Sequence, residues 1–258
     1  MESSIVLPTG FDWQHWFSRW ERMQERYLVA REERFDTMLR LIRASQPQVA
    51  RILDLGCGPG SLMLRLLEQF PHAEVVGVDF DPTLLVLAQA QLAEFGDRAT
   101  FIRADLREPS WVDQWSAPFD AVVSATALHW LTGQQLSLLY RRAAQVVRPG
   151  GIFLNADHVG SEFQPLQDEW ERHADELLAQ VAQGAADDWS GFWNAYGHAL
   201  NVDIAKIHQV AWDAQGVEEG MPLAWHFHQL KASGFRYVDC FWRRDGDAIY
   251  GGMSENFK

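Results

Sequence analysis

A glycine-rich segment is the clearest candidate for a ligand-binding site in the sequence. It reads Asp54-Leu55-Gly56-Cys57-Gly58-Pro59-Gly60. Glycines between a strand and a helix let the backbone bend sharply and approach a ligand closely. A phosphate-binding P-loop would end in Gly-Lys-Ser or Gly-Lys-Thr, whereas Ser61 and Leu62 follow here, so this class is excluded. A dinucleotide fingerprint needs its third glycine at the position of Ser61, which disfavours nicotinamide and flavin binding although Asp79 would suit it.

The residues around this segment alternate between strand and helix patterns. Apolar runs predict strands at 51–55, 74–79, 100–102, 119–124 and 151–155, and helical spacing predicts helices at 62–67, 84–92 and 136–147. Such alternation predicts an α/β fold with a doubly wound, mostly parallel sheet. Ligands of such sheets bind beyond the carboxyl ends of the strands, where the glycine-rich segment begins.

Helical patterns precede and interrupt this alternation. N-terminal helices are predicted within residues 12–45, where Trp13, Trp16, Trp20, Met23 and Tyr27 recur at helical spacing on one face. A helical insertion is predicted over residues 160–220, with an apolar stripe of Phe163, Leu166, Trp170, Leu177 and Val181 and helices at 192–200 and 204–212. A helix at 223–232, a strand at 235–242 and an Asp245-Gly246 hairpin leading to a strand from Ala248 then complete the sheet.

These patterns divide the chain into four regions. Residues 1–45 form an N-terminal helical cover, 46–158 the ligand-binding core, 159–221 the helical insertion, and 222–258 the C-terminal helix and hairpin. The insertion and the Trp13, Trp16 and Trp20 face are expected to close over a second ligand, because the core motifs leave little to recognise one.

Composition excludes several functional classes. The chain has 258 residues, 47% of them hydrophobic, with two cysteines and a formal net charge of −13. Thirteen acidic but only two basic residues lie between Asp157 and Met221, which disfavours nucleic-acid binding because phosphates would be repelled. No apolar run approaches the roughly 18 residues of a membrane span, and the first residues lack a signal-peptide pattern. A cytoplasmic location is expected, and the oligomeric state is left open.

Three motifs in order carry a family resemblance. The sequence Asp-x-Gly-x-Gly-x-Gly from Asp54, then Asp79 ending the second predicted strand, then Arg103-Ala104-Asp105-Leu106 after the third resembles the class I S-adenosylmethionine-dependent methyltransferases. The resemblance covers about residues 35–156. It implies a seven-stranded sheet whose last strand, at 248–252, is antiparallel.

The resemblance also implies cofactor contacts. Asp54 would bind the methionine ammonium, Asp79 the two ribose hydroxyls, and Phe80 would lie against the adenine. Asp105 would accept from the adenine amine, with Leu106 adding a backbone contact. The full set assigned to S-adenosylmethionine is Asp54, Gly56, Gly58, Gly60, Asp79, Phe80, Asp105, Leu106 and Ser124.

The methyl acceptor is expected beyond the fourth strand, at residues 124–131. There His129 is a candidate general base, a residue that orients a carboxylate, or a histidine packed beside Trp130. This His-Trp stretch resembles small-molecule carboxyl methyltransferases such as the trans-aconitate enzymes, which implies a small metabolite and slightly favours an oxygen acceptor. An N-methyltransferase of a cationic amine, suggested by the acidic insertion, and a non-catalytic cofactor-binding module remain alternatives.

No metal site is predicted from the remaining histidines. His226 and His228 are two residues apart on a predicted helix, so they diverge by roughly 200° and cannot ligate one ion together.

Overall fold

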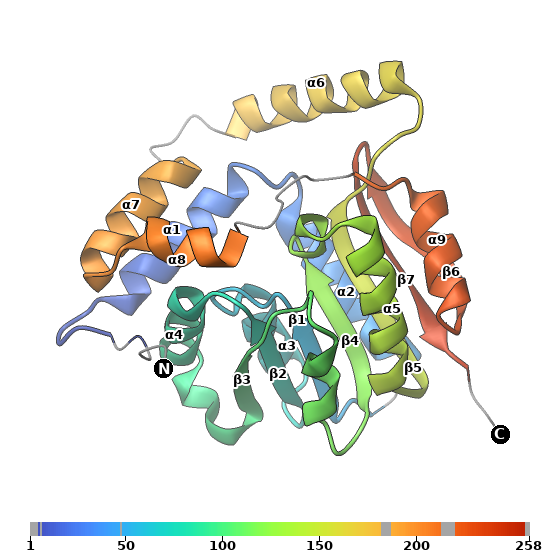
Figure 1. Cartoon of the computed structure of the whole chain (residues 1–258), viewed down its shortest axis with the longest axis horizontal. Helices are drawn as coiled ribbons and strands as arrows, with labels where there is room; N and C mark the ends of the chain where they lie inside the picture. The colour runs from blue at the N-terminus through green and yellow to red at the C-terminus, as the bar shows by residue number, and fades with distance from the viewer. Residues whose placement is uncertain (1–4, 6, 47, 182–186, 213–219, 256–258) are drawn as a thin grey trace.

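The computed structural model describes residues 5, 7–46, 48–181, 187–212 and 220–255. These residues include a seven-stranded sheet covered by helices on both faces (Figure 1). The strands are β1 (Arg51–Leu55), β2 (Glu74–Asp79), β3 (Ala99–Arg103), β4 (Phe119–Ala125), β5 (Val147–His158), β6 (Phe235–Arg244) and β7 (Asp247–Ser254). Their order is β3-β2-β1-β4-β5-β7-β6, with β7 antiparallel to both neighbours. The predicted doubly wound, mostly parallel sheet with an antiparallel last strand is confirmed.

Alternating side chains of the strands pack against two helical layers. Ile52 of β1 lies in the core formed with α2 and α3, whereas Leu53 and Leu55 lie in the core formed with α5 and α9. None of the described helices is long and apolar enough to cross a membrane. The helices are α1 (Trp13–Glu25), α2 (Arg31–Ser45), α3 (Ser61–Gln69), α4 (Pro82–Gln91), α5 (Gly133–Val146), α6 (Gln164–Val181), α7 (Trp189–Leu200), α8 (Ile204–Trp212) and α9 (Leu223–Ala232).

The helical pattern predicted over residues 12–45 forms two helices, α1 and α2, with a break between them that the sequence did not indicate. The chain leaves α1 after Glu25 and enters α2 at Arg31, and between them Ala30 has a φ of 55°, which a right-handed helix cannot contain. The predicted aromatic stripe is buried at Trp16, Trp20 and Met23. Tyr27, beyond the end of α1, is 40% exposed.

The predicted insertion contains α6, α7 and α8, between β5 and α9. In Figure 1, α7 and α8 lie beside α1, and α6 spans the upper edge of the molecule. The helix predicted from the stripe starting at Phe163 is present as α6. Phe163 is 65% and Leu166 40% exposed, whereas Trp170 and Leu177 of the same stripe line a cavity of about 310 Å³ beneath α6. The side chain of Val181 lies outside the described residues.

Candidate functional site

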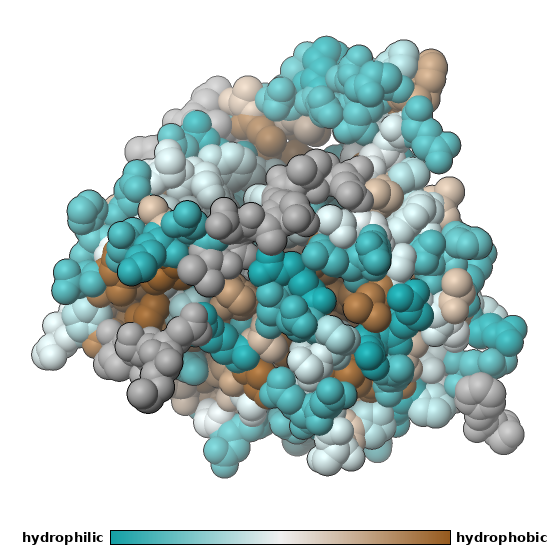
Figure 2. All heavy atoms as spheres, in the orientation of Figure 1, coloured by the Kyte–Doolittle hydropathy of each residue, from teal (hydrophilic) through white to brown (hydrophobic). Residues whose placement is uncertain are grey.

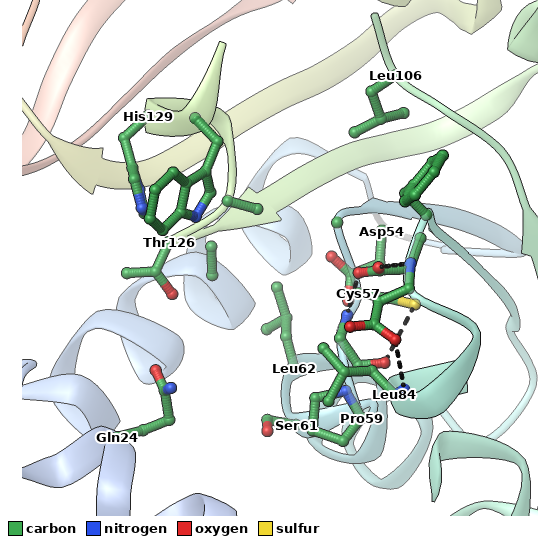
Figure 3. Close-up of a pocket in the computed structure, with 18 of the residues that line it drawn as sticks. Gln24, Asp54, Cys57, Pro59, Ser61, Leu62, Leu84, Leu106, Thr126 and His129 are labelled. Atoms are coloured by element: carbon green, nitrogen blue, oxygen red, sulfur yellow. Dashed lines mark hydrogen bonds between the residues drawn. The ribbon is translucent and has the colours of Figure 1, made fainter. Parts of the chain in front are cut away.

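A cavity of about 520 Å³ opens at the carboxyl ends of β1 to β4. This is the edge at which strand order reverses, between β1 and β4, and where ligands of doubly wound sheets bind. Figure 3 shows His129 and Gln24 on the side of this cavity away from Asp54 and Cys57. The volume lies in the range typical of small-molecule sites.

The glycine loop between β1 and α3 forms one wall. Gly56 has a φ of 71°, and a Cβ added to it would lie 2.4 Å from the Cβ of Ala127. Gly58 has a φ of 53° and also lines the cavity. Gly60 does not line it: an added Cβ would lie 2.9 Å from Cδ1 of Leu92, so this glycine permits close packing of α3 on α4.

Two carboxylates face the same wall from neighbouring strands. Asp79 Oδ2 accepts from the Gly58 N–H at 2.7 Å, and Asp79 Oδ1 accepts from the Asp81 N–H at 2.8 Å. Asp54 Oδ2 is buried and has no hydrogen-bond partner among the described residues. Burial, aided by the charge of Asp79, raises the pKa of Asp54 to about 8. Burial also raises the pKa of Asp79 to about 6, against the lowering effect of its backbone donors.

The predicted adenine contacts line the cavity beyond Asp79. Phe80, Asp105 and Leu106 all belong to the lining. The carboxylate of Asp105 is already engaged, because the Arg107 guanidinium donates to both of its oxygens at 2.7 to 3.0 Å. The same guanidinium lies 5.7 Å from the centroid of the Phe80 ring. An adenine placed against Phe80 would therefore contact a ring that is held in position by the Arg107 guanidinium.

Ser124 does not line the cavity. Its side chain is buried, and its hydroxyl donates to the Leu55 carbonyl at 2.6 Å, which joins β4 to β1 at the base of the glycine loop. Its role in the described structure is to position the loop. Cys57 is buried within the loop, and burial raises the pKa of its thiol, which disfavours a reactive thiolate.

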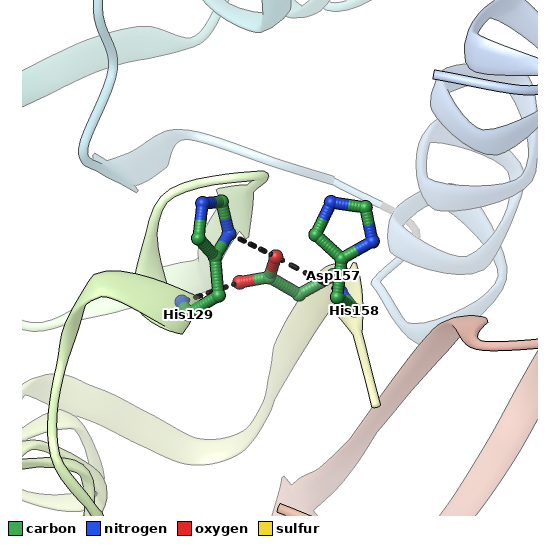
Figure 4. A group of neighbouring side chains, drawn as sticks. All are labelled: His129, Asp157 and His158. Atoms are coloured by element: carbon green, nitrogen blue, oxygen red, sulfur yellow. Dashed lines mark hydrogen bonds and ion pairs between the residues drawn. The ribbon is translucent and has the colours of Figure 1, made fainter. Parts of the chain in front are cut away.

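His129 lies on a short 3-10 turn, Leu128–Trp130, that follows β4. Its Nδ1 is 2.7 Å from Oδ1 of Asp157, and its backbone N–H donates to Asp157 Oδ2 at 3.1 Å (Figure 4). Burial alone would raise the pKa of Asp157, but the charges and hydrogen bonds of His129 and His158 hold it below its ordinary value. Asp157 is therefore ionised, and it orients the His129 ring.

His158 ends β5 and also lines the cavity. Its Nδ1 is 2.8 Å from Oδ1 of Asp247. Burial alone would lower the pKa of His158, but the hydrogen bond to Asp247 and the charge of Asp157 raise it. Our sequence reasoning missed Asp157 and His158, although both follow the predicted fifth strand directly. Their place at a strand end was the available signal.

Behind Asp157 lies a buried polar network. Asn155 Nδ2 donates to the Tyr250 hydroxyl at 2.8 Å, and the Tyr140 hydroxyl is 2.7 Å from His226 Nδ1 and 3.1 Å from the Tyr250 hydroxyl. Burial lowers the pKa of His226 to about 4, so this ring is neutral. His228 is exposed while His226 is buried, which agrees with their predicted divergence.

Aromatic residues of α1 and α7 form a further wall of the cavity, the roof. Trp20, Trp189 and Trp193 line the cavity, and the Trp20 ring lies 5.9 Å from the Trp193 ring. The Arg19 guanidinium of α1 pairs with both oxygens of Asp187, just before α7, and the Tyr196 hydroxyl joins α7 to α4 by donating to the Thr83 carbonyl at 2.8 Å. Among the other aromatic residues of the insertion, Phe192 and Tyr196 are buried core residues, Trp170 lines the cavity beneath α6, and the Trp212 side chain lies outside the described residues.

Comparison with known proteins finds a family of domains that is similar to the core of the chain. The family model of a methyltransferase domain matches residues 52–151, which begin in β1 and run into β5. Over this segment, the chain is similar to methyltransferase domains.

Curated relatives match the same segment and its surroundings. Trans-aconitate 2-methyltransferase of Variovorax paradoxus is 35% identical over 112 residues, which cover 43% of this chain and 40% of that protein. Malonyl-acyl-carrier-protein O-methyltransferase of Bacillus cytotoxicus is 31% identical over 136 residues, 52% of this chain and 44% of that protein. The chain thus spans less than half the length of each of these two relatives.

A solved structure matches nearly the whole chain. Magnesium protoporphyrin IX methyltransferase from Synechocystis, solved with bound SAH, superposes with a TM-score of 0.57 at 16% identity, covering 93% of this chain and 94% of that chain. This likeness shows that the chain shares its overall fold with that protein.

Proposed function

We propose that this chain is an S-adenosylmethionine-dependent methyltransferase that acts on an oxygen atom of a small molecule. The observation that carries the proposal is the buried, unpartnered Oδ2 of Asp54 beside the glycine loop. A buried carboxylate oxygen without a donor is costly, and a ligand cation would relieve that cost. The ammonium of S-adenosylmethionine is such a cation.

The remaining lining residues fit the rest of this cofactor. Gly56 and Gly58 line the cavity without side chains, which leaves space for its methionine end. Each carboxylate oxygen of Asp79 accepts one backbone N–H. Each oxygen also has a second lone pair, which could accept from a ribose hydroxyl. Phe80 would lie against the adenine, with Asp105 and Leu106 at its edge. When bound, S-adenosylmethionine supplies a methyl group already activated by its sulfonium.

The acceptor would lie on the other half of the sheet. The acidic residues among the described lining, Asp54, Asp79, Asp81 and Asp105, all come from β1, β2, β3 or the turns that follow them. His129 and His158 instead follow or end β4 and β5. The described lining of the acceptor end therefore offers the imidazoles of His129 and His158, and the carboxylates behind them, Asp157 and Asp247, are engaged by these same histidines. This arrangement favours an oxygen acceptor over a cationic amine, because an imidazole N–H donates to oxygen, whereas an ammonium would have to compete with the histidines for the carboxylates.

Methyl transfer mainly requires alignment of the acceptor and exclusion of water. The roof residues Trp20, Trp189 and Trp193 supply an apolar wall that excludes water. A hydroxyl acceptor must also lose a proton, which the His129 ring, oriented by Asp157, is placed to accept. A carboxylate acceptor needs no base, and His129 would then donate to one of its oxygens.

The test is methyl transfer from labelled cofactor to a fractionated cell extract. The protein is incubated with methyl-labelled S-adenosylmethionine and, separately, with the small-molecule and macromolecular fractions. We expect S-adenosylhomocysteine and a labelled small molecule whose label is either released as methanol by mild alkaline hydrolysis, as from a methyl ester, or located on a hydroxyl oxygen by mass spectrometry and NMR. Cofactor binding without S-adenosylhomocysteine would indicate a non-catalytic module, and label confined to macromolecules or to amines would contradict the proposed acceptor class.

A further inference from the structure

We propose that His129, Asp157 and His158 bind one divalent transition-metal ion at the acceptor end of the cavity. One candidate ligand atom from each side chain lies within 4.8 Å of the others (Figure 4). His129 comes from the turn after β4, and Asp157 and His158 from the end of β5. The proposal goes beyond the methyltransferase reaction, and metal binding itself does not rest on that reaction.

The contact between His129 and Asp157 is short enough for one cation to interact with both side chains. The Nδ1 atom and Oδ1 atom are 2.7 Å apart, and both atoms carry electron pairs. A cation must therefore lie between them, and that cation is either a proton or a metal ion. Bonds of about 2.0 to 2.2 Å from one ion to each atom are compatible with this separation. Binding of the ion displaces the shared proton to solvent, so charge and atoms balance.

His158 is arranged as metal-binding histidines usually are. Such a histidine donates its second ring N–H to a carboxylate or carbonyl, which fixes the tautomer and leaves the other nitrogen for the metal. Here Nδ1 of His158 lies 2.8 Å from Oδ1 of Asp247, so Nε2 remains for the ion. Asp247 is itself near Arg34, whose Nη1 lies 3.4 Å from the same oxygen. The three candidate ligand atoms lie within 4.8 Å of one another, and a rotation of the His158 side chain would bring its Nε2 toward the other two.

Asp157 is held rigidly for this task. Its Oδ1 also accepts from the His158 N–H at 3.0 Å, and its Oδ2 accepts from the His129 N–H at 3.1 Å. Two backbone donors from the two elements that carry the histidines therefore fix the carboxylate between them. A preorganised ligand of this kind loses little conformational entropy when an ion binds.

The ligand set selects a class of ion. Two imidazoles and one carboxylate suit Fe²⁺, Co²⁺, Zn²⁺ or Mn²⁺, whereas Mg²⁺ and Ca²⁺ prefer all-oxygen sites. Three ligands from one wall leave further coordination positions for a ligand in the cavity, which both histidines line. In the proposed methyl transfer, such an ion would bind and polarise the acceptor oxygen. This last step alone rests on the proposed function.

The test is a Co²⁺ titration of untagged protein that has been stripped of metal. We expect a visible absorption spectrum that saturates at one ion per chain and is abolished by an equivalent of Zn²⁺. His129→Ala and His158→Ala should each weaken Co²⁺ binding by about 100-fold or more. Asp247→Asn should weaken it by about 10- to 100-fold, because Asp247 orients His158 without itself being one of the three ligands, and a merely structural role would leave the spectrum unchanged.

A matched control comes from α6. His173 Nδ1 is 2.6 Å from Oδ2 of Asp245, so this pair repeats the histidine–carboxylate contact without a third ligand. His173→Ala should leave Co²⁺ binding unchanged. His129→Gln and His158→Gln, read together with their melting temperatures, separate loss of a ligand from loss of the fold.

Two results overturn the proposal. One is a titration in which Co²⁺ and Zn²⁺ fail to bind the native protein at micromolar concentration. The other is binding that survives in both His129→Ala and His158→Ala. Methyl transfer is measured separately, so absence of activity with an intact metal site would remove the proposed reaction and leave the metal site standing.

Discussion

Asp54 and Asp79 face the same cavity wall from neighbouring strands but differ in their hydrogen bonds. Asp79 accepts two backbone N–H groups, whereas Oδ2 of Asp54 accepts none. Burial raises the pKa of both, to about 8 for Asp54 and about 6 for Asp79. In the free protein at neutral pH, Asp54 is therefore largely protonated, and a ligand cation would have to displace that proton.

Cofactor affinity should consequently depend on pH. Protonated Asp54 cannot attract an ammonium, so affinity for S-adenosylmethionine should rise as pH increases toward about 8 and then level off. Calorimetry in buffers of different ionisation enthalpy should show proton release on binding near neutral pH. Asp54→Asn should lose most of this dependence above pH 7, whereas Asp97→Asn, on the exposed surface, should retain it. The same slope in Asp54→Asn would remove Asp54 from the cofactor site.

Asp79→Ala should weaken S-adenosylmethionine binding by roughly 30- to 150-fold, the effect of losing about 2 to 3 kcal/mol of charge-assisted hydrogen bonds. The variant also loses the acceptor for the Gly58 N–H, so the glycine loop should become easier to open. Isothermal titration measures the affinity, and hydrogen exchange at Gly58 measures the loop. Unchanged affinity would show that Asp79 does not contact the cofactor.

Gly56→Ala should abolish cofactor binding through steric collision. Its φ of 71° strains any side chain, and its new Cβ would lie 2.4 Å from the Cβ of Ala127. Gly96→Ala is the matched control, because Gly96 also has a positive φ, 55°, but nothing lies within 4 Å of an added Cβ. We expect at least tenfold weaker binding only in Gly56→Ala, measured beside the melting temperatures. Equal losses in both variants would mean that backbone strain alone matters.

Alanine substitutions of Trp189 and Trp193, two tryptophans of the roof, should affect different properties, namely methyl transfer and the stability of the fold. Trp193 is 4% exposed and packed among rings, so Trp193→Ala should cost about 3 to 5 kcal/mol of unfolding free energy. Trp189 is 37% exposed and lines the cavity, so Trp189→Ala should keep the melting temperature and cofactor affinity but lower methyl transfer. If Trp189→Ala instead lost stability and cofactor affinity together, the roof would be structural.

His129→Ala should lower methyl transfer by about 10² to 10⁴-fold while leaving cofactor affinity within a few-fold. The two roles of His129 differ in which constant changes. Loss of a proton acceptor lowers kcat, whereas loss of a group that orients a carboxylate appears mainly in KM. Wild-type kinetics in this variant would show that the ring only packs beside Trp130.

The sheet and its cofactor wall could be predicted from the sequence because their signals are local. Buried strands are short apolar runs, and the positions of Asp54, Asp79 and Asp105 follow from where those runs end. The Asp245-Gly246 turn was also predictable, since the structure places it between β6 and β7. Ser124 shows the limit of a strand-end argument: its neighbours line the cavity, but its own side chain points to the Leu55 carbonyl.

The acceptor end could not be predicted because it depends on contacts between distant segments. Asp157 meets His129 across 28 residues, and Asp247 meets Arg34 across 213 residues. The break at Ala30 could not be predicted either. Its neighbours keep the helical spacing, and alanine is not a residue type that favours a positive φ. The exposure of α6 was missed because periodicity predicts an apolar face but not what covers it.

Helix α7 of the roof is joined by hydrogen bonds to residues that line the proposed cofactor site. Tyr196 of α7 donates to the Thr83 carbonyl in the first turn of α4, and Thr83 in turn donates to Asp81, whose N–H is held by Asp79. A ligand that holds Asp79 in place should therefore also hold α7 in place, the helix that we propose covers the acceptor. The two binding equilibria should be thermodynamically linked, so each ligand would raise the affinity for the other by the same factor.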